Sequence, residues 1–280
     1  MIESCQASWN PPQSRRIGTL DYRKHQEVAE IAAREAGAIL MSSYRKVAAR
    51  EKGPFDLVTD ADIACQRRIA AILNEAFPDH TFLGEEEDAR PDPDNPWRWI
   101  VDPLDGTANF AHGLAPWCVS IALEHAGELV VGAIYIPLEE RMVSASKGLG
   151  TTINGVPSRV SDAGALSKSL IATGFPVTFD RDVEQTMAYF RRMSTGTHSV
   201  RRSGSSAWNL AMVAAGSVEV CYAITMHPWD AAAGVVLVRE AGGTVTNLQG
   251  GPHDLYQEAI LATNGKVHEE TVAALNRAWP

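Results

Sequence analysis

The sequence predicts a protein of the α+β or α/β class in which helices cover the sheets. Between about residues 117 and 158, apolar residues alternate with polar ones in runs separated by turns, a pattern typical of antiparallel hairpins. After Pro157, short apolar strands instead alternate with helical patterns, which indicates a sheet packed against helices. The chain has 280 residues and is 45% hydrophobic and 21% charged, which is enough apolar material for a sizeable core.

The first part of the chain predicts a flexible extension followed by two helices. Residues 1–20 are polar and carry two adjacent prolines, so we expect no regular structure there. Apolar residues recur at helical spacing from Tyr22 to about Tyr44 and from about Asp60 to Ala76, and the segment EKGPFDLV breaks the pattern between them. Thr59 and Asp62 form the pattern of a capping box at the start of the second helix.

Strands and hairpins are predicted next. The segments TFLG and RWIVD have the composition of short strands, and the proline-rich loop ARPDPDNPW separates them. Turn residues at Ala126-Gly127 and Asn154-Gly155 divide the alternating stretch into hairpins. We therefore expect residues 21–156 to form an N-terminal α+β half.

The remainder of the chain predicts alternating strands and helices. Strands are expected at 169–175, 199–204, 218–224, 243–247 and 259–264, and helices at 182–193, 205–217, 229–243 and 266–277. We expect this part, residues 157–280, to form a C-terminal α/β half.

Composition and charge exclude several classes of protein. The net charge is −9 and the pI is near 5.4, and the sequence has no basic patch of the kind that binds nucleic acid. The four cysteines form no Cys-x-x-Cys pair, so we expect buried or free thiols rather than a zinc site. We find no apolar signal region and no run of about 18 apolar residues, so we expect neither secretion nor a membrane span. The expectation is a soluble cytoplasmic protein.

The segment IVDPLDGTANF carries two carboxylates at the end of a predicted strand. The proline favours an extended backbone at Asp102 and Gly106 allows a tight bend, so that Asp102 and Asp105 can face one point. The Leu104 carbonyl and the Thr107 hydroxyl are close in sequence, and oxygen ligands of these kinds suit Mg²⁺ and Ca²⁺. A solvated turn, in which these residues only favour a bend, is the alternative.

Two further acidic positions are candidates. Glu85 follows a strand and a glycine, which places it at the sheet edge where α/β proteins bind ligands, whereas the acids at 86–88 are interpreted as a solvated loop. Asp230 begins an apolar helix, and the alternative there is a simple interaction with the helix dipole. His227 is interpreted as a loop histidine, because Mg²⁺ prefers oxygen to imidazole.

Together these acids predict more than each does alone. The four candidate acids are Glu85, Asp102, Asp105 and Asp230. If they converged, each uncompensated pair of like charges 4 Å apart would cost roughly 4 kcal/mol at an effective dielectric near 20. Such a cluster persists only when cations fill it. Two divalent ions about 3.5–4 Å apart suit in-line attack on phosphorus, because one activates water and the other stabilises the leaving oxygen.

The chain resembles the inositol monophosphatase family of Mg²⁺-dependent, lithium-sensitive phosphatases. The matching segments are DLVTDAD, FLGEEE, WIVDPLDGTANFAHG, RRSGSSAWNLAMVAAG and PWDAAAGVVLVREAGG, which follow the order of the family and span most of the chain from about residue 25. The resemblance implies a layered αβαβα sandwich of the sugar-phosphatase type and a homodimer. It also implies hydrolysis of a small phosphate monoester by metal-activated water, with a small phosphorylated metabolite as the partner.

The resemblance further implies a set of metal ligands for two or three Mg²⁺ ions. Glu85, Asp102 and the Leu104 carbonyl would hold the first ion. Asp102, Asp105 and Asp230 would hold the second, and a third, weaker ion would lie near Glu85 and waters.

Catalytic and substrate-binding positions follow from the same resemblance. Asp62 and Thr107 would orient the attacking water, with Glu85 as a further catalytic residue, and the amides of Gly106 and Thr107 would receive phosphate oxygens. The residues implied to contact the substrate are Asp105, Gly106, Thr107, Gly204, Ser205, Ser206 and Asp230. For the serine pair, helix capping is the alternative. Asp62 can serve both its cap and catalysis, because a carboxylate has two oxygens.

One position departs from the family pattern. Relatives that cleave inositol phosphates usually carry a glutamate seven residues before the aspartate of the Trp-Asp pair, and here that residue is Ala223. The inositol contact is missing, which weakens the case for inositol as the alcohol. The resembling family also includes enzymes for histidinol phosphate, fructose 1,6-bisphosphate and adenosine 3′,5′-bisphosphate, which are the alternative substrates. A non-catalytic cation-binding regulatory module is the alternative from another class. Lys52 is interpreted as an ordinary exposed lysine, and a place near the mouth of the site is the alternative.

Overall fold

The computed structural model of the chain describes residues 20–46, 50–53, 56–86, 94–175 and 183–277, without the side chains of the described residues between 51 and 58. The predicted flexible extension, apart from its last residue, lies outside the described residues, as does the Lys52 side chain. Among the described helices, none combines the length and the hydropathy that a bilayer span requires. The described cysteines, Cys65, Cys118 and Cys221, are buried and unpaired, as expected.

The helices are α1 (Arg23–Ser43), α2 (Asp60–Ala76), α3 (Thr107–Ala111), α4 (Val183–Ser194), α5 (Ser206–Ala214), α6 (Pro228–Glu240) and α7 (His268–Asn276). The strands are β1 (Arg50–Gly53), β2 (Asp56–Val58), β3 (Thr81–Gly84), β4 (Trp97–Asp105), β5 (Cys118–His125), β6 (Glu128–Ile136), β7 (Arg141–Ser146), β8 (Thr151–Ile153), β9 (Val156–Ser158), β10 (Leu170–Thr173), β11 (Ser199–Arg202), β12 (Val220–Ala223), β13 (Thr244–Thr246) and β14 (Ile260–Thr263).

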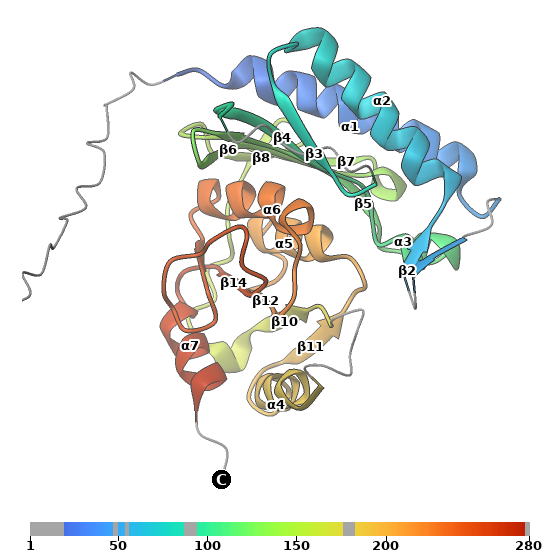
Figure 1. Cartoon of the computed structure of the whole chain (residues 1–280). Coiled ribbons are helices and arrows are strands. Elements are labelled where there is room, and N and C mark those ends of the chain that lie inside the picture. Colours follow the sequence, from blue (N-terminus) through green and yellow to red (C-terminus); the bar gives the residue numbers. More distant parts are fainter. Residues whose placement is uncertain (1–19, 47–49, 54–55, 87–93, 176–182, 278–280) are drawn as a thin grey trace, which may run out of the picture.

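Within the described residues, these elements stack in layers and form the αβαβα sandwich that the resemblance implies (Figure 1). Helices α1 and α2 cover the outer face of the first sheet, α5 and α6 lie between the two sheets, and α4 and α7 cover the outer face of the second. Each interface between a sheet and its helices has an apolar core. Trp99 belongs to the first core, Val236 to the middle one and Tyr189 to the last.

The order and direction of the strands in the two larger sheets determine which strand ends lie side by side. Among the described residues, seven strands form the first sheet in the order β3-β4-β5-β6-β7-β8-β9, and five form the second in the order β11-β10-β12-β14-β13. Strands β3 and β4 run parallel, so their carboxyl ends reach the same sheet edge, and the later strands of this sheet pair as the predicted antiparallel hairpins. In the second sheet β10 pairs in parallel with β11 and β12, which requires crossover connections.

Two features differ from the sequence predictions. Strands β1 and β2 form an antiparallel pair where only a break was expected. The strand expected to end at Asp102 continues to Asp105, because Asp105 still pairs with Cys118 of β5 after an irregularity in the register. Proline has no amide to donate to a sheet, and a strand tolerates it at such an irregularity, which here includes Pro103.

Helix α6 is the central element of the middle layer. Every residue from Ala231 to Val238 is buried, because the helix packs against the first sheet and against α5. Glycines permit this approach: a Cβ on Gly132 of β6 would lie 2.5 Å from the Ala233 carbonyl oxygen, and a Cβ on Gly234 would lie 2.3 Å from Leu210 Cβ of α5. This packing determines where α6 begins relative to the sheet.

A stack of rings connects α1 and α2 to the start of β4. The Trp97 ring stacks on His125 with centroids 3.6 Å apart and on His80 at 4.8 Å, and His25 stacks on Phe77 at 4.4 Å. Burial lowers the pKa of His25 and of His125. Burial lowers the pKa of His80 to about 4, with a further contribution from the charges of His25 and His125. The three imidazoles are therefore neutral at pH 7.

Lowering the pH from 7 to 5 is expected to destabilise the fold by about 1–2 kcal/mol through His80. The pKa of His80 is about 4 in the folded chain against a usual value of 6.5, so the unfolded chain takes up the proton first as the pH falls. The penalty is absent above pH 6.5 and grows toward pH 4, and partial exposure reduces it. Urea titrations in chelator at both pH values measure it.

The matched variant is His80→Phe, which retains a ring for stacking but does not titrate. We expect its stability to fall less than that of the wild type between pH 7 and 5. An equal fall in both proteins would contradict the assignment to His80.

Candidate metal centre

Two aspartates lie at the carboxyl end of β4. Asp102 is 1% exposed and pairs in register with Ser120, and Asp105 is 7% exposed and pairs with Cys118. Gly106 follows with φ +95°, a left-handed conformation that favours glycine, and it turns the chain into α3. The tight bend predicted at this glycine is therefore confirmed.

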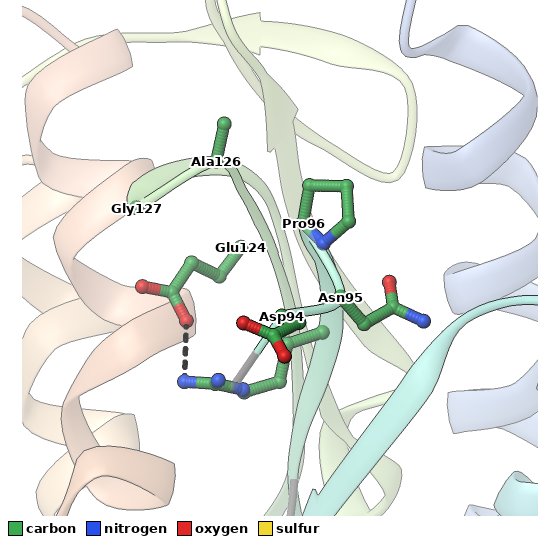
Figure 2. A pocket seen from close by; sticks show the side chains of 7 residues that line it. Asp94, Asn95, Pro96, Glu124, Ala126 and Gly127 are labelled. Atoms are coloured by element: carbon green, nitrogen blue, oxygen red, sulfur yellow. Dashed lines mark hydrogen bonds and ion pairs between the residues drawn. The ribbon is translucent and has the colours of Figure 1, made fainter. Parts of the chain in front are cut away.

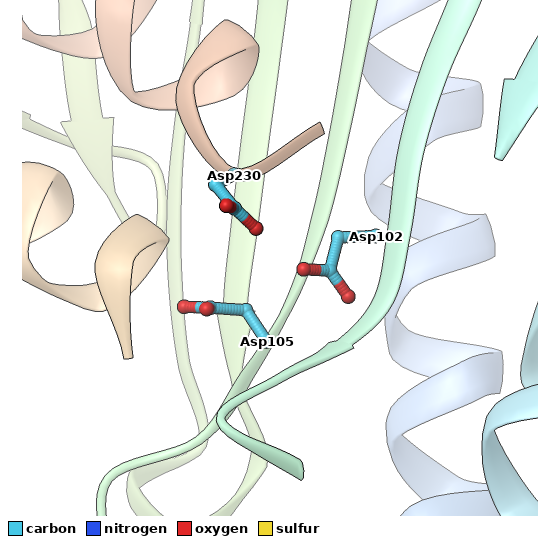
Figure 3. Close-up of side chains that lie close together, drawn as sticks. All are labelled: Asp102, Asp105 and Asp230. Carbon is cyan, nitrogen blue, oxygen red and sulfur yellow. The ribbon is translucent and has the colours of Figure 1, made fainter. Parts of the chain in front are cut away.

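Asp230 reaches the same place from the first turn of α6. The backbone amide of His227 donates to its Oδ2 at 3.0 Å. One carboxylate oxygen from each of Asp102, Asp105 and Asp230 lies within 4.8 Å of the other two, and Figure 3 shows the three side chains gathered around a common space. Among the described residues, this is the group of acidic, histidine or cysteine side chains compact enough to hold a metal ion. The His227 ring instead stacks on Trp229.

Glu85 lies near this cluster but outside its 4.8 Å limit. The residue follows β3, and its amide donates to the Val101 carbonyl oxygen of β4 at 3.2 Å. Its negative charge raises the pKa of both Asp102 and Asp230, which indicates electrostatic coupling to the cluster. The acids at 87–88, predicted to form a solvated loop, lie outside the described residues.

Burial and mutual repulsion make the cluster costly to ionise. Burial raises the pKa of Asp102 well above its usual range, and the charges of Glu85 and the other two aspartates raise it further. Burial, followed by the charge of Asp105, raises the pKa of Asp230 to about 8. Burial also raises the pKa of Asp105, although hydrogen bonds from Ser205 and from α5 amides oppose that shift. A divalent cation would compensate these charges and favour the ionised forms.

The donor atoms fit a hard divalent cation. The cluster offers carboxylate oxygens. The carbonyl oxygen of the buried Leu104 lies 3.0 Å from Thr107 Oγ1, and its role as a metal ligand stays a prediction. Mg²⁺ and Ca²⁺ bind oxygen ligands, whereas softer metals prefer thiolate and imidazole. The acidic triad could therefore bind a metal of the predicted kind, and the identity and number of the ions stay predictions.

Asp62 and Thr107, which are 45 residues apart, come into contact at the start of α3. The Thr59 amide donates to Asp62 Oδ2 at 2.9 Å, which confirms the predicted capping box of α2. Asp62 Oδ1 lies 3.3 Å from Thr107 Oγ1, whose single proton can be donated either to this carboxylate or to the Leu104 carbonyl oxygen. One carboxylate thus caps α2 and also contacts the threonine with which it is predicted to orient water. The catalytic role of the pair stays a prediction.

The predicted substrate-binding segment before α5 lies against Asp105. Gly204 has φ +86°, and a Cβ there would lie 2.9 Å from Asn109 Nδ2. The Ser205 hydroxyl donates to Asp105 Oδ2, and the Ser206 amide donates to Oδ1 at 3.1 Å. The capping alternative is wrong for the Ser205 side chain, which within the described chain makes no capping bond to α5. Its contact with substrate stays a prediction.

Sequence reasoning missed two residues at this centre. Cys118 Sγ lies 3.6 Å from Asp105 Oδ2, and the Asn109 side-chain amide donates to the carbonyl oxygens of Pro116 at 2.7 Å and Ser203 at 2.9 Å. Extending the predicted strand to Asp105 would have paired it with Cys118. The role of Asn109 had no local signal, because it joins segments 94 residues apart.

A hollow of about 360 Å³ lies at the start of β4, at the other end of that strand from the acidic cluster (Figure 2). Its lining residues are Asp94, Asn95, Pro96, Arg98, Glu124, Ala126 and Gly127. Arg98 Nη1 lies 3.2 Å from Glu124 Oε2, and the Tyr256 hydroxyl donates to the same carboxylate oxygen at 2.9 Å. These charges compensate each other and none of the predicted site residues lines the hollow, so it is not the candidate site.

The layered sandwich and its acidic cluster define an α+β protein with a candidate divalent-cation centre where the first sheet meets the middle helices. The chain belongs to the inositol monophosphatase family, whose sequence model matches residues 21–279. It is 42% identical over 251 residues to the inositol-1-monophosphatase of Synechocystis sp., covering 89% of this chain and 88% of that protein.

Two solved structures are similar over most of the chain. The extragenic suppressor protein suhB from Bartonella henselae has a TM-score of 0.87 at 36% identity, covering 91% of this chain and 100% of that one. The inositol monophosphatase from Anabaena (Nostoc) sp. has a TM-score of 0.83 at 39% identity, covering 92% of this chain and 97% of that one. These likenesses confirm the fold and the family, and their different names leave the substrate open.

Proposed function

We propose that the chain is a Mg²⁺-dependent phosphoric monoester hydrolase that acts on a small phosphorylated metabolite through attack by activated water. Membership of the inositol monophosphatase family supports a phosphatase. The observation that carries the proposal is the convergence of Asp102, Asp105 and Asp230 within 4.8 Å, where two segments distant in sequence meet.

The proposed ligands of two or three ions are Glu85, Asp102, the Leu104 carbonyl, Asp105 and Asp230. When bound, Mg²⁺ would compensate the phosphate charge and activate the attacking water. Asp62 is fully buried, and the Thr59 amide holds one of its oxygens at 2.9 Å. Its other oxygen contacts Thr107, so this pair is held in place to orient a water, which supports its proposed role.

The substrate is constrained by Ala223, at the end of β12. This residue is 1% exposed and belongs to the apolar core between the sheets. A ring hydroxyl of an inositol phosphate would find no hydrogen-bond partner in the alanine side chain. We therefore propose a phosphate monoester without committing to inositol, and histidinol phosphate, fructose 1,6-bisphosphate and adenosine 3′,5′-bisphosphate remain the alternatives.

Phosphate release is expected only in the presence of a divalent cation. Because the donors are oxygens around buried like charges, dialysis against chelator should abolish turnover, and added Mg²⁺ should restore it. The assay measures inorganic phosphate from inositol, sugar, histidinol and nucleotide phosphates, ranked by kcat/KM, with and without millimolar lithium.

Full activity after removal of divalent cations would contradict the proposal. If no substrate in the panel releases inorganic phosphate although the chain binds Mg²⁺, the alternative of a non-catalytic cation-binding regulatory module would be favoured. The homodimer implied by the resemblance is part of the proposal and is tested separately by light scattering.

A further inference from the structure

The N-terminus of α5 is bound by a carboxylate from another part of the chain. A serine that precedes a helix ordinarily accepts hydrogen bonds from the second or third helical amide. Asp105 takes that place here: its Oδ2 accepts from the Ala207 amide at 2.8 Å and from the Trp208 amide at 3.4 Å, and its Oδ1 accepts from the Ser206 amide at 3.1 Å. Ser205, which could cap α5 locally, therefore uses its hydroxyl for a different hydrogen bond.

The Ser205 hydroxyl donates its proton to Asp105 Oδ2. Ser205 is 2% exposed, and Cys118 Sγ lies 3.7 Å from its oxygen and 3.6 Å from Asp105 Oδ2. A hydroxyl has one proton to donate, so while this bond persists Ser205 cannot also donate to a substrate oxygen. The bond and the α5 amides together restrain both oxygens of Asp105.

This restraint acts on the acidic cluster. An oxygen of Asp105 lies within 4.8 Å of oxygens of Asp102 and Asp230, and at that distance the like charges of the ionised carboxylates repel one another. Donors on the α5 side counteract that repulsion, and groups that hydrogen-bond a metal ligand commonly set its orientation. Building on the proposed function, we propose that Ser205 is a positioning residue, which orients the Asp105 carboxylate for cation binding in place of the substrate contact that the resemblance implies.

The test uses the full chain and Mg²⁺ alone as the probe. We expect Ser205→Ala to raise the Kd for Mg²⁺, measured by calorimetry, by about ten-fold or more. In steady-state assays at saturating Mg²⁺, KM for the phosphate ester should stay within about two-fold of the wild-type value, because no substrate contact is lost. Ser205→Thr retains the hydroxyl and should restore Mg²⁺ affinity. If Ser205→Ala does not fold, Ser205→Cys supplies a weaker donor of similar shape and should show an intermediate Kd.

The matched control is Ser144→Ala, which removes the same kind of bond elsewhere. Ser144 is buried in β7, and its hydroxyl donates to Glu30 Oε1 of α1 at 2.6 Å, outside the acidic cluster. This variant should be less stable than the wild type but should bind Mg²⁺ with unchanged affinity.

The outcomes separate this inference from the proposed function. An unchanged Mg²⁺ affinity in Ser205→Ala, with a raised KM, would overturn the inference and assign Ser205 to the substrate. A loss of affinity shared equally by Ser144→Ala would also overturn it. If the wild type hydrolyses no phosphate ester but Ser205→Ala still weakens Mg²⁺ binding, the positioning role stands and the proposed function fails.

Discussion

Replacing Asp102 with asparagine is expected to reduce phosphate release by about 10³-fold or more, because metal-derived charge stabilisation contributes several kcal/mol to phosphoryl transfer and each 1.36 kcal/mol is ten-fold in rate. Asp102 belongs to the acidic cluster, and the charges of Glu85, Asp105 and Asp230 all raise its pKa. Asparagine has the same shape but lacks the negative charge, so cation binding should weaken while the fold persists. Inorganic phosphate release at saturating Mg²⁺ measures the rate.

The same variant should reverse the order of stability when cations are removed. Burial and neighbouring carboxylates raise the pKa of Asp102, so the ionised side chain is unfavourable without a cation. In chelator, Asp102→Asn should therefore have a Tm equal to or above that of the wild type. In Mg²⁺ the wild type should gain Tm and the variant should gain less, because a ligand stabilises only the form that binds it.

The control is Asp79→Asn, in the exposed loop after α2. It makes the same chemical change outside the cluster and should leave rate and Mg²⁺ response unchanged. An undiminished rate of phosphate release in Asp102→Asn would contradict the assignment of Asp102 to the proposed site.

Replacing Gly234 with leucine is expected to cost about 3 kcal/mol of stability or more, since overpacking a close-packed core typically costs 1–3 kcal/mol and occasionally more. A Cβ at this position would lie 2.3 Å from Leu210 Cβ and 2.4 Å from its Cδ1. The two helices would have to move apart, although the substitution itself improves helix propensity. Urea denaturation at pH 7 measures the change.

The loss should extend to the candidate metal centre, because α5 and α6 carry its donors. Asp230 lies in the first turn of α6, and the first amides of α5 bind Asp105. We therefore expect Gly234→Leu to weaken Mg²⁺ binding as well as to lower stability. Gly164→Leu is the control, because a Cβ at that exposed position would meet nothing within 4 Å. Equal stabilities of the two variants would contradict the packing argument.

Most helices and strands were predictable because their signals are local. Periodic apolar residues locate α1, α2 and the hairpins around Ala126-Gly127 and Asn154-Gly155, and the structure has each of them. The continuation of β4 beyond Asp102 was not predictable in the same way. It depends on a strand partner, Cys118, and on an irregular register that no local pattern records.

The chemistry of the candidate site was also largely accessible from the sequence. Acids at the ends of predicted strands and at a helix start indicated an oxygen-rich centre, and the structure brings Asp102, Asp105 and Asp230 together. The structure also adds distinctions that the sequence lacked: Glu85 lies outside the compact group, and Asp62 touches Thr107 while capping α2.

By itself the sequence determined the fold class and the kinds of donor atoms at the centre, because periodicity and residue type are properties of short segments. Only the tertiary structure decided that Asp105 binds the amides of α5 and that Ser205, 100 residues away, donates to it. A serine before a helix has both a local and a distant partner available. Which one it takes depends on how the first sheet packs against α5, and that packing is determined by contacts across the whole chain.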